Sequence, residues 1–333
     1  MRIDCHAHVI VPEVLRDAAP GEAWRPRVWR EDGAQVVELN GRPIRSAVRE
    51  FVDGEAILAA AGEAGIDRIV LCPWVALLFP GVEAGEALRR CRIQNRGLAA
   101  LQAAHPDRVS VLGAVPLQDP PLAAEELRAL MASGAFAGVE ITAGVGPAQL
   151  GDERLAPFWA AAEETGALVF VHPTTRGFSA PVFAEHYLWN LVGNPMETTV
   201  AAAHLVLSGV LERHPELRVL LAHGGGAVLA LRGRLRHGHA TVAAARGRLG
   251  EPPERSLRRL YYDTVVHDPE LLAQLVAFAG ADHVVLGSDH PFDMGDPRPA
   301  DTVAAANLDP DEEAAVLGGS AARLLGLEVS PWA

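Results

Sequence analysis

Eight short runs rich in β-branched residues recur along the chain, and they constrain its fold more than any other feature. Helical stretches separate them, with apolar residues at i, i+3 and i+4 and charges on the opposite face, as in 153–165, 197–213 and 270–279. This alternation is typical of strand–helix–strand units around a parallel sheet. It predicts an α/β fold, a closed (β/α)₈ TIM barrel. The predicted strands are 2–5, 67–72, 109–115, 138–141, 168–171, 218–222, 260–263 and 283–287.

The segment 24–44 departs from this alternation. Two turn dipeptides, Asp32-Gly33 and Asn40-Gly41, lie on either side of the alternating run 35–39. They predict a small antiparallel β insertion after the first strand, within 13–48. Loops that follow barrel strands reach the C-terminal mouth of the barrel. We therefore expect the insertion to cover the active site or to shape a subunit contact.

Length and charge narrow the class of protein. A chain of 333 residues fits one barrel domain, 1–333, that includes the insertion. The formal net charge is -13 and no basic run is present, which argues against nucleic acid and an anionic membrane surface as partners. All 29 basic residues are arginine. The absence of lysine excludes Schiff-base catalysis, pyridoxal phosphate and a metal bridge made by a carbamylated lysine.

Three cysteines are widely spaced and form no CxxC pair: Cys5, Cys72 and Cys91. They predict neither a disulfide framework nor a thiolate zinc site, and they fit a reducing compartment. The chain starts MRIDCHAH without an apolar signal segment, and no apolar run approaches the roughly 20 residues that span a bilayer. We expect a cytoplasmic protein. No glycine-rich dinucleotide fingerprint follows a strand, so no organic cofactor is expected.

Metal-ligating side chains follow three of the predicted strands. His6 and His8 come after the first strand, His172 after the fifth and Asp289 after the eighth. The C-terminal ends of barrel strands meet at one rim, where catalytic groups collect, and an extended segment points His6 and His8 to the same side. The four residues form an N₃O set with one open position. We predict one divalent metal ion, Zn²⁺ with Mn²⁺ as the alternative.

His223 follows the sixth strand, opposite the first, and is the predicted acid/base residue, with Asp289 beside it in the catalytic set. The alternative is that His223 is a fifth metal ligand. Asp263 ends the seventh strand and either orients His223 or a metal ligand, or caps the following helix. The glycines 224–226 either let the backbone approach substrate closely or form a tight turn.

Arginine is the one permanent cation available for an anionic substrate. Arg232, Arg234 and Arg236 lie beyond the AHGGG turn, and Arg45 and Arg49 follow the predicted insertion. Each is either a solvated surface residue or part of a bidentate carboxylate clamp.

Several motifs together resemble one known family. They are IDCHAH, FVHPTT, WNLVGNPMETT, SGVLERHPELRVLLAHGGG, GRLRHG, YYDTVVHDP, VVLGSDHPF and LLGL, and they cover nearly the whole chain. The chain resembles the amidohydrolase-related metal-dependent decarboxylases typified by aminocarboxymuconate semialdehyde decarboxylase. The resemblance implies that His6, His8, His172 and Asp289 bind the metal and that His223 is catalytic. It also implies a homodimer in which Arg234 of the neighbouring subunit binds the substrate carboxylate.

Two positions depart from the family pattern. The helix before Gly65 has no arginine where the family carries a second substrate-binding arginine, and His290 replaces a usual tyrosine. Both changes are expected to touch the pocket and to favour a related but different carboxylate. Relatives that act on phenolic acids often have glutamate in place of the first histidine of the strand-1 motif. Because His6 is present, the chain is more similar to the aminocarboxymuconate branch.

These features predict nonoxidative decarboxylation of a small unsaturated or aromatic carboxylic acid. The metal would lower the pKa of its bound water toward about 7, and His223 would receive that proton. Protonation of the carbon that bears the carboxylate would then release carbon dioxide. The alternatives on the same barrel are hydrolysis of a lactone, amide or imine, and hydration of an unsaturated acid. A metal-binding scaffold without activity is a further class, which the complete set of site residues disfavours.

Overall fold

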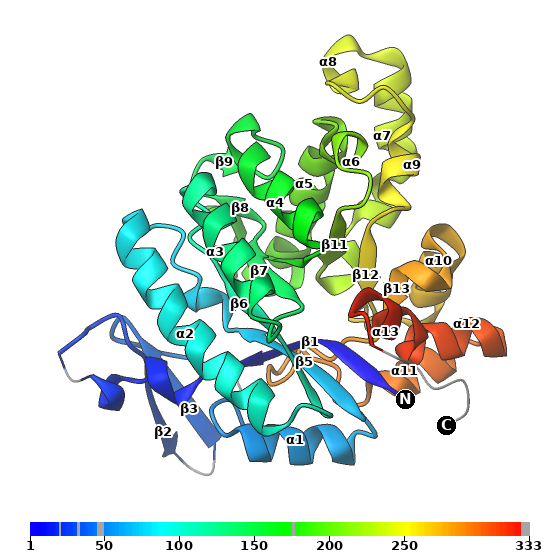
Figure 1. Ribbon diagram of the computed structural model, residues 1–333. Coiled ribbons are helices and arrows are strands. Elements are labelled where there is room, and N and C mark those ends of the chain that lie inside the picture. Colours follow the sequence, from blue (N-terminus) through cyan, green and yellow to red (C-terminus); the bar gives the residue numbers. More distant parts are fainter. Residues whose placement is uncertain (20, 32–33, 45–49, 175–176, 328–333) are drawn as a thin grey trace.

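The computed structural model describes residues 1–19, 21–31, 34–44, 50–174 and 177–327. Its centre is a parallel sheet whose strands follow one another in chain order around a barrel, with helices outside (Figure 1). All eight predicted strands are confirmed, with small differences at their ends. They are β1 (Ile3–Val9), β5 (Arg68–Pro73), β6 (Val109–Ala114), β7 (Gly138–Thr142), β10 (Leu168–His172), β11 (Arg218–Leu221), β12 (Tyr261–Asp263) and β13 (Val284–Val285).

Backbone hydrogen bonds join the first strand to the segment that follows the last. The nitrogen of Cys5 donates to the oxygen of Leu286, and that of His8 to the oxygen of His290, each over 2.8 Å. In return, the nitrogen of Asp289 donates to the oxygen of His6, also over 2.8 Å. These bonds close the barrel seam, and they bring two predicted metal ligands from opposite ends of the chain to the same place.

The helices cover the barrel wall. Aspartates cap several of them: the side chains of Asp53, Asp119 and Asp268 each accept backbone N–H groups of the first turn. The predicted helix 197–213 is wrong in one respect, because Gly209 has φ of 73° and ends the first helix there. The helices are α1 (Gly54–Glu63), α2 (Ala84–Ala104), α3 (Pro120–Ala132), α4 (Ala156–Thr165), α5 (Asn194–Leu207), α6 (Val210–Arg213), α7 (Val228–Thr241), α8 (Ala243–Arg246), α9 (Pro253–Leu257), α10 (Pro269–Ala279), α11 (Pro299–Ala305), α12 (Pro310–Ala314) and α13 (Ser320–Leu324).

Strand alternation divides the core into two buried clusters. On β10, Val169 and Val171 belong to the large cluster between the wall and the helices, whereas Leu168 and Phe170 face the other way into a smaller cluster. Helix α13 also contributes to the smaller cluster. The ring of Phe170 lies 4.7 Å from that of His6, centroid to centroid. The small cluster therefore packs directly beneath the candidate site.

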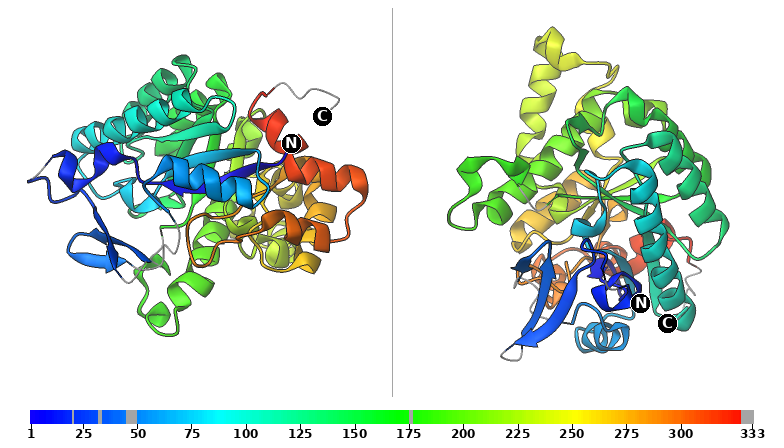
Figure 2. Two further views of the ribbon diagram at one scale, coloured as in Figure 1. Left: turned by 90° about the horizontal axis from the view of Figure 1, so that it is seen from below. Right: turned by 90° about the vertical axis from the view of Figure 1, so that its left-hand side faces the viewer.

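The predicted insertion forms a small antiparallel sheet that stands beside the barrel (Figure 2). Its strands are β2 (Arg27–Glu31), β3 (Ala34–Leu39) and β4 (Arg42–Ile44). Between β3 and β4, Asn40 and Gly41 have φ of 53° and 74°, the positive values that a tight hairpin turn requires, so this predicted turn is confirmed. The predicted turn at Asp32-Gly33 lies outside the described residues.

Helices α7 and α8 project away from the barrel (Figures 1 and 2). Within the described part of the chain, no helix is long and apolar enough to cross a membrane.

Candidate metal centre

Five predicted site residues meet at the C-terminal mouth of the barrel. His6 and His8 lie on β1, His172 ends β10, His223 follows β11 and Asp289 follows β13. One ligand atom from each of His6, His172, His223 and Asp289 lies within 4.8 Å of the others. His8 joins this group through Nε2, which is 3.2 Å from Nε2 of His6 and 3.3 Å from Oδ1 of Asp289.

The Nδ1 atoms of three histidines are held by hydrogen-bond acceptors. Nδ1 of His6 lies 2.6 Å from Oδ2 of Asp263, and Nδ1 of His8 lies 2.9 Å from the carbonyl oxygen of Pro73. Nδ1 of His172 lies 2.9 Å from the carbonyl oxygen of Pro173. These acceptors favour a proton on each Nδ1, which leaves the Nε2 lone pair free.

The free lone pairs converge with a carboxylate. Nε2 of His6 lies 3.1 Å from Oδ1 of Asp289. Nε2 of His172 is buried and has no hydrogen-bond partner among the described residues, an arrangement that is costly unless something binds it. Three imidazole nitrogens and one carboxylate are the donor set that zinc and similar divalent cations prefer. The residues present therefore fit a divalent metal ion.

Burial and charge set the protonation of the site. Burial lowers the pKa of His8, and burial together with the neighbouring histidines holds that of His172 well below its usual range. Burial would lower the pKa of His6 too, but the carboxylates of Asp289 and Asp263 raise it to about 10. Burial would raise the pKa of Asp289, but His6, His223 and His8 hold it well below its usual range. His8, His172 and Asp289 are thus held in the forms that bind a cation, namely neutral imidazoles and an ionised carboxylate, whereas His6 has to release a proton when a cation binds.

Asp263 supports both a candidate ligand and the candidate acid/base residue. Besides the contact with His6, its Oδ2 accepts the backbone N–H of His223 over 2.9 Å, and its Oδ1 accepts that of Gly224 over 2.8 Å. His6 and His223 outweigh the effect of burial and lower the pKa of Asp263. Of the two predicted roles, orientation of the site is supported directly. Oδ1 of Asp263 also accepts the backbone N–H of Val265 over 3.1 Å in the turn after β12, but the helix that follows, α10, is capped by Asp268.

The glycines after His223 form a tight turn. All three have positive φ, and a Cβ on Gly226 would lie 2.0 Å from the carbonyl oxygen of Pro195. His223 and Asp289 also have positive φ, 56° and 55°, which is uncommon for residues with side chains. Nε2 of His223 lies 3.4 Å from Oδ2 of Asp289, and its Nδ1 has no described partner. The ring of His223 is 16% exposed, whereas the side chains of His6 and His8 are fully buried.

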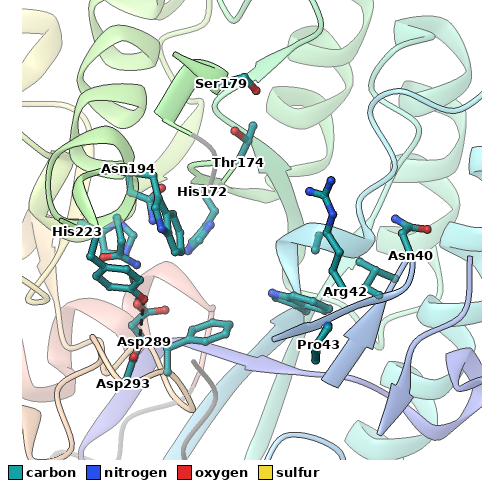
Figure 3. A pocket seen from close by; sticks show the side chains of 17 residues that line it. Asn40, Arg42, Pro43, His172, Thr174, Ser179, Asn194, His223, Asp289 and Asp293 are labelled. Atoms are coloured by element: carbon teal, nitrogen blue, oxygen red, sulfur yellow. Dashed lines mark hydrogen bonds and ion pairs between the residues drawn. The ribbon is translucent and has the colours of Figure 1, made fainter. Parts of the chain in front are cut away.

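A cavity of about 980 Å³ opens above the candidate metal centre (Figure 3). His172, His223 and Asp289 line its base, and Asn40 and Arg42 of the insertion lie on the opposite wall. The expectation that the insertion covers the active site is therefore supported. Aromatic side chains complete the walls, namely Trp74, Tyr187, Trp189 and Phe292.

Arg42 is a residue that sequence reasoning missed. It lines the cavity, is exposed, and makes no ion pair with another described residue. The signal available was its position directly after the Asn40-Gly41 turn, in the segment expected over the barrel mouth. As predicted, α1 carries no arginine, but β4 supplies a cation to the cavity. The predicted candidates Arg45 and Arg49 lie outside the described residues.

The arginines of α7 do not line their own chain's cavity. Arg234 is exposed, and α7 projects from the barrel (Figure 1). Arg232 donates to the carbonyl oxygen of Leu229, and Arg236 pairs with Glu254 over 3.0 Å.

The side chain of His290 is not among the described residues that line the cavity above the candidate metal centre. Its Nε2 lies 3.0 Å from the carbonyl oxygen of Glu50, and its backbone N–H donates to Oγ of Ser288. The main cavity is lined instead by Asp289 and Phe292 on either side of the His290-Pro291 dipeptide. The expectation that His290 touches the pocket stays a prediction, since His290 is not among the described residues that line this cavity.

Glu140 is a second residue that the sequence analysis missed. It is buried on β7, and its Oε1 lies 3.9 Å from Nδ1 of His8. Neither carboxylate oxygen has a hydrogen-bond partner among the described residues, and burial raises the pKa of Glu140 well above its usual range. An acidic residue in the middle of an apolar strand was the available signal.

Comparisons with known proteins show which sequences the chain resembles. The family model described as amidohydrolase matches residues 3–327. The chain is 31% identical to 2-amino-3-carboxymuconate-6-semialdehyde decarboxylase of Dictyostelium discoideum over 332 residues, which covers 98% of this chain and 92% of that protein. The resemblance inferred from the motifs is thereby confirmed.

Two solved structures share the fold. A 5-carboxyvanillate decarboxylase from Sphingomonas paucimobilis superposes with a TM-score of 0.83 at 23% identity, covering 98% of this chain and 99% of that one. A 5-carboxyvanillate decarboxylase from Novosphingobium aromaticivorans, complexed with manganese and 4-hydroxy-3-methoxy-5-nitrobenzoic acid, gives a TM-score of 0.82 at 19% identity. It covers 98% of this chain and 96% of that one. The predicted barrel is thereby confirmed.

Proposed function

Since this chain belongs to the amidohydrolase family, we propose that it is a metal-dependent nonoxidative decarboxylase of a small unsaturated or aromatic carboxylic acid. One observation carries the proposal: four candidate metal ligands and His223 lie together, and three of these residues, His172, His223 and Asp289, line the base of a single cavity. The relative from Dictyostelium discoideum is itself named a decarboxylase.

His6, His8, His172 and Asp289 would hold the metal. The N₃O donor set suits Zn²⁺, and Mn²⁺ is the alternative because a structural relative was crystallised with manganese. A divalent cation bound there supplies a Lewis acid that polarises a substrate oxygen. Asp263 would keep His6 oriented with its Nε2 toward the cation.

His223 would move the proton. It is the most exposed of the four histidines at the base, and its Nδ1 has no described partner, so it can exchange a proton with a molecule in the cavity. The imidazolium donates a proton to the carbon that bears the carboxylate. The C–C bond to the carboxylate then breaks, its electron pair restores the double bond, and carbon dioxide leaves. The net change replaces the carboxylate by hydrogen.

Arg42 and the aromatic walls would select the substrate. The guanidinium of Arg42 can bind a carboxylate, while Trp74 and Phe292 offer flat apolar surfaces to a conjugated acid. The cavity is large enough for a substituted aromatic ring.

Arg234 would act across a homodimer. Its exposure and the projection of α7 support a role in a neighbouring subunit's cavity (Figure 1).

A cytoplasmic location also stays a prediction. The three cysteines support it, because Cys5, Cys72 and Cys91 are free and buried.

Hydrolysis of a lactone, amide or imine, or hydration of an unsaturated acid, remains the alternative on the same site. Product analysis separates these reactions. Metal-loaded protein is incubated with a panel of aromatic and unsaturated carboxylic acids, and the products are identified by mass spectrometry. Decarboxylation predicts a mass loss equal to carbon dioxide. Addition of water with every carboxylate retained would contradict the proposal.

A further inference from the structure

The cavity above the candidate metal centre adjoins a second hollow of about 640 Å³, here called the far lobe and defined by Phe79, Val82 and Phe178. The first cavity alone, at about 980 Å³, is at the upper end of the volumes that hold a drug-sized ligand. A single-ring acid would therefore leave much of the space unfilled. Several residues line both hollows, so one molecule can extend from one to the other. The shared residues are Leu39, Asn40, Ala76, Thr174 and Ser179.

The wall of the far lobe carries no net formal charge. Among the described residues that line it, Arg90 is the one cation and Glu197 is the one carboxylate. Both have partners within the protein. Nε of Arg90 donates to Glu86 over 2.7 Å, and Oε1 of Glu197 accepts the backbone N–H of Phe178 over 2.8 Å. An occupant of the lobe therefore needs no charge of its own.

Two hydroxyl groups of the wall are likewise bonded within the protein. The O–H of Thr142 donates to the carbonyl oxygen of Gly144 over 2.7 Å, and the O–H of Thr174 donates to Oε1 of Glu197 over 2.9 Å. Much of the remaining wall is apolar, as is usual for sites that bind an uncharged ring. Its apolar side chains include Leu39, Val75, Ala76, Phe79 and Val82.

Phe178 presents an exposed aromatic side chain at the far lobe. It lines the lobe and is 49% exposed, which makes it one of the few large apolar residues of the described chain that are open to solvent. Its φ is 59°, an uncommon value for a residue with a side chain, and the buried carboxylate of Glu197 holds its N–H in that position.

A strained backbone that keeps an apolar ring open to solvent is a reason to look for a function of that ring. A ligand that covered the ring of Phe178 would gain free energy by removing apolar surface from water. An aromatic ligand would also pair with the ring edge-to-face or offset-stacked. Because Phe178 lines the far lobe, the space that such a ligand would fill adjoins the cavity above the candidate metal centre.

We infer that the far lobe is a subsite for an uncharged aromatic ring, the distal ring of a substrate whose carboxylate is lost at the candidate metal centre. The inference rests on the proposed function, since it names the substrate class of the same site, an aromatic acid with two linked rings. The first ring would occupy the cavity lined by Trp74 and Phe292. The second ring would extend past Ala76 and contact Phe178.

Calorimetric titration of metal-loaded protein with three acids tests this inference without requiring turnover. The probes are benzoate, 3-phenylbenzoate and 4-phenylbenzoate, and the last two point the second ring in different directions. The readout is the ratio of the Kd for benzoate to the Kd for the tighter-binding two-ring acid. We expect a ratio of at least about ten for the wild-type protein, as burial of one phenyl ring provides.

Two substitutions alter the far lobe, and their residues do not line the first cavity. Val82→Trp fills the lobe and should bring the ratio close to one. Phe178→Ala removes the exposed ring and should lower the ratio by roughly threefold or more, as the loss of an aromatic pair predicts. Val182→Ala is the matched control, because Val182 is 72% exposed and lines neither hollow, and it should keep the wild-type ratio.

If one variant fails to fold, the other still decides. A wild-type ratio close to one, no binding of either two-ring acid, or a ratio that survives the substitutions would overturn the inference. Failure of the proposed function gives a different result. A high ratio that the substitutions remove, without release of carbon dioxide from any acid, would support the ring subsite and refute decarboxylation.

Discussion

Oδ2 of Asp263 lies 2.6 Å from Nδ1 of His6, and both side chains are fully buried. The same carboxylate accepts the backbone N–H groups of His223 and Gly224. One side chain at the end of β12 therefore orients a candidate metal ligand on β1 and the candidate acid/base residue after β11. Binding of a cation by His6 and the position of His223 would therefore depend on the same carboxylate.

Asp263→Asn should weaken metal binding by about 10- to 100-fold, because an amide that donates to Nδ1 favours the wrong tautomer of His6. A competition titration with a zinc chelator measures the change. Asp301→Asn, which alters an exposed ion pair with Arg298, is the control and should leave metal affinity unchanged. Metal affinity equal to wild type in Asp263→Asn would show that this contact does not orient a ligand.

Arg42→Gln should raise KM for the carboxylate substrate by about 10- to 100-fold, the loss of a charge-assisted hydrogen bond, with little change in Tm. The fold should tolerate the change because Arg42 is exposed and makes no ion pair with a described residue. Arg27→Gln is the matched control on the same small sheet, since its side chain is 58% exposed. An unchanged KM in Arg42→Gln would remove Arg42 from the proposed substrate site.

Mixed dimers test whether the site is shared between subunits. His223→Ala and Arg234→Ala chains should each be inactive alone, and mixing them should restore activity through the hybrid dimer, in which one of the two sites is complete. His223→Ala should also keep its metal, because His223 is proposed to move a proton rather than to bind the ion. No recovery on mixing would mean that each site is built within one chain, and loss of metal from His223→Ala would make it a ligand.

The buried thiols should make stability fall at high pH. Burial raises the pKa of Cys91 from 9.0 to about 12, so above pH 9 the unfolded chain loses this proton while the folded chain keeps it. The unfolded state then binds fewer protons, and the free energy of unfolding should fall by roughly 1 kcal/mol per pH unit between pH 9 and 12 from this group. Denaturant titrations of wild type and Cys91→Ala measure the difference. Parallel curves for the two proteins over this pH range would contradict the expectation.

The strand pattern predicted the barrel because each run of β-branched residues encodes its own strand, and closure follows from having eight of them. The turn at Asn40-Gly41 could also be predicted from its own two residues, because both asparagine and glycine tolerate the positive φ that the turn requires. The break at Gly209 was harder to predict, because a single glycine in an amphipathic pattern does not by itself end a helix.

The position of a side chain relative to the cavity depends on packing rather than on sequence spacing. His290 is adjacent to a predicted metal ligand, yet its ring points to the carbonyl oxygen of Glu50. Arg42 reaches the cavity because the hairpin places it there, and its position after the Asn40-Gly41 turn was the one local signal that distinguished it from the surface arginines nearby. The convergence of the candidate metal ligands was predictable because strand ends fix where those side chains meet.

Carbon dioxide release on metal add-back tests the central claim most directly. Protein is stripped with a chelator, incubated with the acid panel, and then supplied with one equivalent of Zn²⁺ or Mn²⁺ while dissolved carbon dioxide is followed. We predict no release before the metal is added, and afterwards release equal to the acid consumed. Release that is unaffected by chelation, or acid consumed with every carboxylate retained, would contradict the account.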